Sequence, residues 1–196
     1  MEKKKYKKYQ AVRESNPAFT LNQIGKIAFN RAKAGERYQQ LEVISVQLMC
    51  ALTMEAVLNH IGKKLFEDWE KVERKLSPKD KLIMVAKHSE LEIDLGSRPF
   101  QFLPEIFRFR DSLVHAKSSK HFANKIHENN IDENGFPIIQ SIDELSTDWE
   151  KLCSIETAKK WRKAVDNISS ILSEAAKCDD PIKIGDVIDT WGEIET

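Results

Sequence analysis

Apolar residues recur every three or four positions along much of this chain, which is the spacing of one face of an α-helix. A first helix is expected at 20–34, with Thr20 as its cap. The clearest helix is expected at 36–64, because its centre, 43–61, is apolar at nearly every position. A helix that is apolar on most sides is buried on most sides. The segment 36–64 is therefore predicted to be the central helix of the fold.

Three more helices are expected after the central one. Ser77 followed by Pro78 is typical of a helix start and predicts a helix over 77–87. A proline in the first turn likewise marks a helix over 104–117. The last helix is expected at 154–177, with an apolar stripe along one side. That stripe consists of Trp161, Val165, Ile168, Leu172 and Ala175.

The chain divides into one helical domain and two charged ends. Residues 118–148 are polar and irregular, so a long irregular insertion is expected before the last helix. We predict an all-α bundle of four to five helices over 19–178. A basic, flexible segment is expected at 1–18 and an acidic tail at 179–196. The 31 basic and 31 acidic residues of the whole chain cancel, which gives no global attraction for nucleic acid.

Cysteine usage and hydropathy place the protein in a reducing, aqueous compartment. Cys50, Cys153 and Cys178 are scattered and form no CxxC pair, which argues against a disulfide framework. No apolar run approaches the ~20 residues that span a bilayer, and the lysine-rich start lacks the apolar stretch of a secretory leader. We therefore expect a cytoplasmic protein that makes no membrane contact.

An arginine, an acid and a histidine occur together in the helix expected over 104–117. With a rotation of about 100° per residue, four residues share its polar side. These are Arg108, Asp111, Ser112 and His115. Arg110 instead falls within the apolar arc, where an unpaired guanidinium is strongly unfavourable.

Two explanations are compatible with the position of Arg110. In the first, Arg110 pairs with Glu55, the one carboxylate within 43–61. In the second, Arg110 faces a cleft or a second subunit and binds a phosphate, for which its planar fork is suited. His115 lies near the helix C-terminus, which favours a protonated imidazole. Asp111, one turn earlier, is placed to orient that imidazole.

The segment 110–115, Arg-Asp-Ser-Leu-Val-His, resembles the Rx4–6H motif of HEPN domains. The preceding apolar stretch 48–59 is similar to the central helix of that family, which often carries a Glu and then an Asn, here Glu55 and Asn59. The resemblance extends over about 36–117 together with the final helix.

The resemblance implies an antiparallel helical bundle that forms a homodimer, with the two motif helices at the interface. Many such domains are metal-independent endoribonucleases of toxin–antitoxin, phage-defence, stress-response or RNA-processing systems. The family pattern implies that Arg110 stabilises the scissile phosphate, His115 is the general acid or base, and Asp111 orients His115. RNA is the implied partner, with an antitoxin or regulatory protein as a further one. No cofactor and no metal is implied.

Either of two arginines could be the arginine of the motif. Arg108 also fits the motif, as Arg108-x6-His115, and it shares a helical face with His115, whereas the form of the motif favours Arg110. Supporting roles are expected for Glu55 and Ser112.

The lysines that follow the motif have two interpretations, and so does the activity of the protein. Lys117 and Lys120 are candidates to line an RNA path, with a solvated loop as the other interpretation. A fraction of the family has lost catalysis. The alternative function is therefore a non-catalytic HEPN-like module that binds nucleotide, RNA or a protein.

Overall fold

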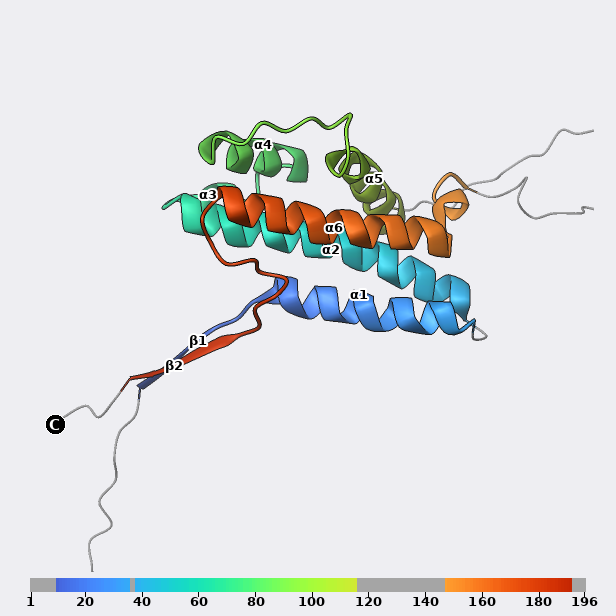
Figure 1. The fold of residues 1–196 in the computed structure, drawn as a ribbon, viewed down its shortest axis with the longest axis horizontal. Coiled ribbons are helices and arrows are strands. Elements are labelled where there is room, and N and C mark those ends of the chain that lie inside the picture. Colours follow the sequence, from blue (N-terminus) through green and yellow to red (C-terminus); the bar gives the residue numbers. More distant parts are fainter. Residues whose placement is uncertain (1–9, 36–37, 116–146, 192–196) are drawn as a thin grey trace, which may run out of the picture.

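The structure is a computed structural model that describes residues 10–35, 38–115 and 147–191, and its described part is mostly helical (Figure 1). The α-helices are α1 Pro17–Ala34, α2 Gln39–Leu65, α3 Trp69–Val72, α4 Pro78–His88, α5 Leu103–Val114 and α6 Ile155–Ala175. Two 3-10 turns, η1 Phe100–Phe102 and η3 Glu150–Leu152, precede α5 and α6. The strands are β1 Gln10–Glu14 and β2 Val187–Trp191.

The central helix of the fold is α2, as its apolar pattern predicts. It packs against α1, α6, α4 and α5 (Figure 1). Val46, Met54 and Leu58 of α2 are completely buried. Its length and apolar composition also make α2 a candidate membrane span, with a mean hydropathy of 1.7. Half of that window is buried inside the bundle.

The helix starts follow the capping residues in the sequence. Ser77 accepts a hydrogen bond from the Asp80 amide, and the Asp80 carboxylate accepts one from the Ser77 amide, which closes a capping box at α4. Ser154 caps α6 in a similar way through the amide of Thr157. The five long helices agree with the expected helices to within a few residues. The predicted insertion over 118–148 lies almost wholly outside the described residues.

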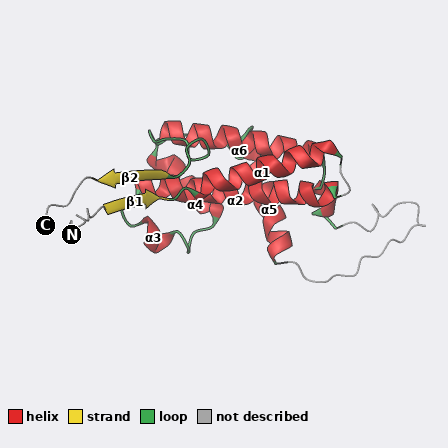
Figure 2. Cartoon of the chain, turned by 90° about the horizontal axis from the view of Figure 1, so that it is seen from below, coloured by secondary structure: helices red, strands yellow, loops and turns green. Residues whose placement is uncertain are grey.

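A two-stranded antiparallel ladder projects from one end of the bundle (Figures 1 and 2). Its strands come from the two segments that the sequence analysis set apart as charged ends. Asn16 fastens the ladder to the bundle, because its side chain donates to the carbonyls of Pro181 (2.7 Å) and Ile184 (2.6 Å). Its backbone amide donates to Asp186 (2.8 Å), and Arg13 forms an ion pair with the same carboxylate. The hydropathy pattern did not predict either strand.

Candidate active site

The helix α5 presents Arg108, Asp111 and His115 on the side away from the core. Leu103, Ile106 and Phe109 are buried against the bundle, so Arg108 and His115 point to solvent. Val114 lies at the end of the apolar arc that helical periodicity predicts for this segment, but it is 63% exposed.

Arg110 lies between the two faces of α5 and is held by two carboxylates. Its Nη1 lies 2.5 Å from Oε2 of Glu55, which projects from the middle of α2. Its Nε and Nη2 donate to Oδ1 of Asp111, at 2.9 and 2.6 Å. The guanidinium also lies 5.5 Å from the ring centre of Phe107. The Glu55 contact expected from the sequence is therefore present, and Arg110 keeps 17% of its side-chain surface exposed.

Lys81 completes this charged group and was missed by the sequence analysis. Its side chain is only 4% exposed, and its Nζ lies 3.4 Å from Oε1 of Glu55. Glu55 is therefore shared between a lysine of α4 and an arginine of α5. The available signal was the position of Lys81 one turn before Val85, on the buried stripe of α4. A buried lysine requires an acid nearby, and Glu55 is that acid.

A pocket of about 380 Å³ opens between the start of α4 and the outer face of α5. The α4 side supplies Ser77, Pro78, Lys79 and Leu82. The α5 side supplies Leu103, Pro104, Phe107, Arg108, Arg110 and Asp111, with Leu95 from the preceding connection. Both candidate motif arginines therefore line the same pocket, although one is exposed and the other half-buried.

His115 stands at the end of α5, beyond this pocket. It is the C-cap residue, and its amide donates to the backbone carbonyl of Asp111. Its exposed imidazole forms no hydrogen bond or ion pair with any described residue. The carboxylate of Asp111 is bound to Arg110 rather than to His115, which differs from the orienting role expected for it. The Ser112 hydroxyl donates a hydrogen bond to the backbone carbonyl of Phe109, at 2.7 Å.

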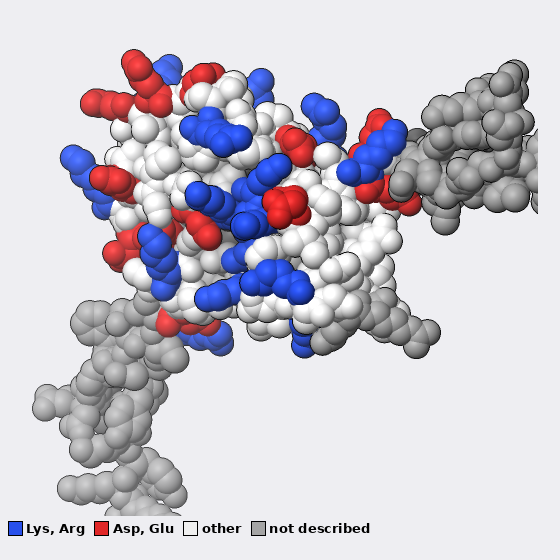
Figure 3. All heavy atoms as spheres, turned by 45° about the vertical axis from the view of Figure 1, so that its right-hand side comes forward, with Lys and Arg blue, Asp and Glu red and all other residues white. Residues whose placement is uncertain are grey.

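The two candidate RNA-binding lysines, Lys117 and Lys120, lie outside the described residues. On the face drawn in Figure 3, the Lys and Arg side chains are mixed with Asp and Glu, and the densest basic group lies near its centre.

Where α1 meets α6, Arg162 contacts Asn22 at 3.5 Å. Burial raises the pKa of the neighbouring Asp166 despite the attraction of Arg162.

Arg110 retains capacity for a ligand despite its two carboxylate partners. A guanidinium has five N–H donors, and the contacts with Glu55 and Asp111 use three of them. The other two donors have no partner among the described residues, and the orientation of the group is fixed from two sides. Such a group can bind a phosphate oxygen without first losing side-chain freedom.

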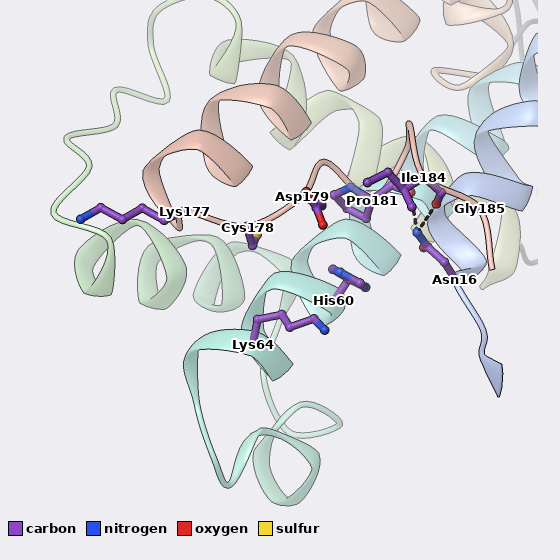
Figure 4. Close-up of a pocket in the computed structure, with 9 residues that line it drawn as sticks. All are labelled: Asn16, His60, Lys64, Lys177, Cys178, Asp179, Pro181, Ile184 and Gly185. Carbon is purple, nitrogen blue, oxygen red and sulfur yellow. Dashed lines mark hydrogen bonds between the residues drawn. The ribbon is translucent and has the colours of Figure 1, made fainter. Parts of the chain in front are cut away.

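A second pocket, of about 490 Å³, lies where the ends of α2 and α6 meet the base of the ladder (Figure 4). His60, Lys64, Cys178 and Asp179 line it, and Asn16 fastens its edge. Burial, assisted by the negative charge of Asp179, raises the pKa of the Cys178 thiol. The thiol is therefore protonated at neutral pH and is a weak nucleophile.

The other two cysteines are similarly unreactive in this environment. Burial raises the pKa of Cys50 to about 12 and that of Cys153 to about 11. Among the described residues, no three His, Cys, Asp or Glu side chains lie close enough together to hold a metal ion.

Comparisons with protein-family models, curated proteins and solved structures found no match for this chain. A fixed arginine with two open donors, a second exposed arginine and an exposed imidazole occur within two turns of one helix. The arginines can bind an anion, and the imidazole is a group that can transfer a proton.

Proposed function

We propose that this protein is a metal-independent endoribonuclease of HEPN type that acts as a homodimer. The observation that carries the proposal is the state of Arg110. Glu55 and Asp111 fix its guanidinium, five residues before the exposed His115, while no other residue in the described ranges accepts from its last two N–H donors. A bound phosphodiester would thus meet a preorganised cation and an imidazole on one helix.

The chemistry that suits these groups is transesterification of RNA. The ribose 2′-hydroxyl attacks the adjacent phosphorus, the bond from phosphorus to the 5′-oxygen breaks, and a 2′,3′-cyclic phosphate and a 5′-hydroxyl result. Arg110 stabilises the negative charge that grows on the phosphate oxygens. One His115 imidazole accepts the proton of the 2′-hydroxyl, and a protonated His115 of the second copy donates a proton to the leaving oxygen.

The dimer is proposed to form through the outward side of α5. The exposed Val114 lies next to His115 at the end of α5, and a second copy that packs there would cover both. Two-fold contact between α5 helices would bring two copies of the motif together. We further propose a cytoplasmic role in phage defence, toxin–antitoxin pairing or stress response, with an antitoxin or regulatory protein as a partner.

The second candidate function is a non-catalytic binding module of the same fold. One observation favours it. The carboxylate of Asp111 serves Arg110, so no described acid orients the imidazole of His115. A module of this kind would use the same arginines to bind RNA, nucleotide or a protein without cutting anything.

The test is incubation of total RNA with the full-length protein in EDTA. We expect the wild type to release fragments ending in 2′,3′-cyclic phosphate, because the proposed mechanism uses no metal. His115→Ala should lose this activity by at least about 10²-fold, the contribution of an acid–base group. His88→Ala, which removes an exposed histidine from another helix end, is the control.

Two results would contradict the proposal. Cleavage that survives in His115→Ala would remove His115 from the mechanism. Absence of cleavage by the wild type, with all three proteins folded by circular dichroism, would favour the binding module. Light scattering on the same samples measures the dimer, and a monomer that still cuts RNA would contradict the two-copy mechanism.

A further inference from the structure

The pocket between α4 and α5 is larger and more apolar than a phosphate alone requires. Leu82, Leu95 and Leu103 line it alongside the ring of Phe107. A phosphate gains nothing from such walls, whereas a planar, largely apolar group does. The volume of about 380 Å³ falls in the range of sites that take small organic ligands.

The cations of the pocket surround these apolar walls. Lys79, at the start of α4, and Arg108, on α5, both line the pocket and form no ion pair or hydrogen bond with a described residue. Arg110 adds its two open donors. The pocket thus offers positive charge beside an apolar surface, which suits a ligand with an anionic group attached to a flat ring.

Asp111 adds an acceptor to this set of donors. Arg110 binds only Oδ1 of Asp111, so Oδ2 can accept a hydrogen bond from an N–H group. A nucleobase has ring N–H or amino groups that fit such an acceptor, and its flat face can lie against Phe107 or a guanidinium. Fatty acids and simple sugar phosphates lack one or the other feature.

We infer that this pocket binds one nucleobase of the RNA, with the attached phosphate at Arg108 and Arg110. It thereby determines which nucleotide lies next to the cleaved bond. This inference rests on the proposed function for its link to cleavage, but the binding step can be measured by itself.

The first measurement is calorimetric titration of the full-length chain with the four ribonucleoside 3′-monophosphates and with inorganic phosphate. At least one nucleotide should bind about tenfold more tightly than phosphate, because stacking of the base adds to the ionic contact. Leu95→Trp fills the pocket and should remove this advantage. Lys79→Ala, at an exposed position that spares the core, should weaken nucleotide binding about threefold.

Lys87→Ala is the matched control, because it removes an exposed lysine from the same helix outside the pocket. Its nucleotide affinity should equal that of the wild type. Equal affinity for nucleotides and phosphate, or no binding of either, would overturn the inference. So would nucleotide binding that is unchanged in both Leu95→Trp and Lys79→Ala.

The second measurement separates this inference from the proposed ribonuclease activity. Sequencing of fragment ends from a random RNA pool should show one preferred base beside the cut, and Lys79→Ala should weaken that preference. His115→Ala should lose cleavage and keep its nucleotide affinity. A wild type that binds nucleotides but never cuts RNA refutes the ribonuclease and keeps the pocket. Cleavage with no base preference and no selective nucleotide binding refutes the pocket and keeps the ribonuclease.

Discussion

Two cations, Lys81 and Arg110, are arranged around the partly buried carboxylate of Glu55. This carboxylate accepts from Arg110 at 2.5 Å and lies 3.4 Å from Lys81, which is almost fully buried. Removal of one partner from such a group leaves the others in a poorly solvated site without full compensation. Arg110 therefore has a structural role in addition to any part it plays with RNA.

Replacement of Arg110 should consequently affect stability more than replacement of Arg108. We expect Arg110→Ala to lower the free energy of unfolding by about 2 kcal/mol, since Glu55 loses a charged partner that is largely desolvated. Arg108→Ala, an exposed control on the same helix, should change it by less than about 0.5 kcal/mol. Urea denaturation measures both. Equal stability of the two variants would show that the Glu55 contact contributes nothing.

Asp180 predicts a pH dependence of stability. Burial tends to raise the pKa of its carboxyl, but hydrogen bonds from Ser169, Lys183 and a second serine outweigh burial and hold the pKa below its ordinary value. A lowered folded-state pKa contributes stability above the pKa of the unfolded chain, and this contribution is lost as the pH falls through the folded-state value. Asp180→Asn should therefore cost about 2 kcal/mol at pH 7.

The difference between wild type and Asp180→Asn should shrink as the pH falls below about 4, where the carboxyl of the unfolded chain is protonated. Urea titrations at several pH values measure it. Asp179→Asn, the neighbouring and exposed acid, is the control and should show little change at any pH. A cost that stays constant down to pH 2 would assign the effect of Asp180 to packing.

At the scale of elements, long helices could be predicted from the sequence and short elements could not. Each long helix repeats its apolar spacing over several turns, and residues such as Ser77 and Ser154 mark where helices begin. The helix α3 has four residues, which is too few for a period to appear. The strands β1 and β2 pair across more than 170 residues, so no local pattern connects them.

The packing of α3 against α2 depends on a single glycine. A Cβ atom added at Gly62 would lie 2.3 Å from Cε2 of Trp69, whose side chain is 1% exposed. In an open helix Gly→Ala would stabilise by about 1 kcal/mol. Here Gly62→Ala should instead destabilise by about 1–3 kcal/mol, because the buried indole has to move.

Thermal unfolding of Gly62→Ala measures this effect. Its combination with Trp69→Phe supplies the control, since the smaller ring gives the new methyl group room. The double variant should be less destabilised than the sum of the two single ones. Strict additivity would mean that the indole does not limit the size of the residue at position 62.

At the scale of the whole molecule, one contact between candidate residues could be predicted from the sequence, but the pocket and the other contacts could not. The pairing of Arg110 with Glu55 could be foreseen because both residues stand out in apolar surroundings. The pocket could not be, because it forms only when the start of α4 lies beside α5. The partner of Asp111 could not be read from spacing either, since i,i+4 contact with His115 and i,i+1 contact with Arg110 were both available.

The ladder of β1 and β2 also determines where the chain enters and leaves the fold. Gln10 pairs with Trp191, so the first and last paired residues are neighbours about 5 Å apart. A host protein could therefore carry this bundle within one of its surface loops, because the loop would need to open by little more than the width of one strand pair. The two strands would then connect the bundle to its host.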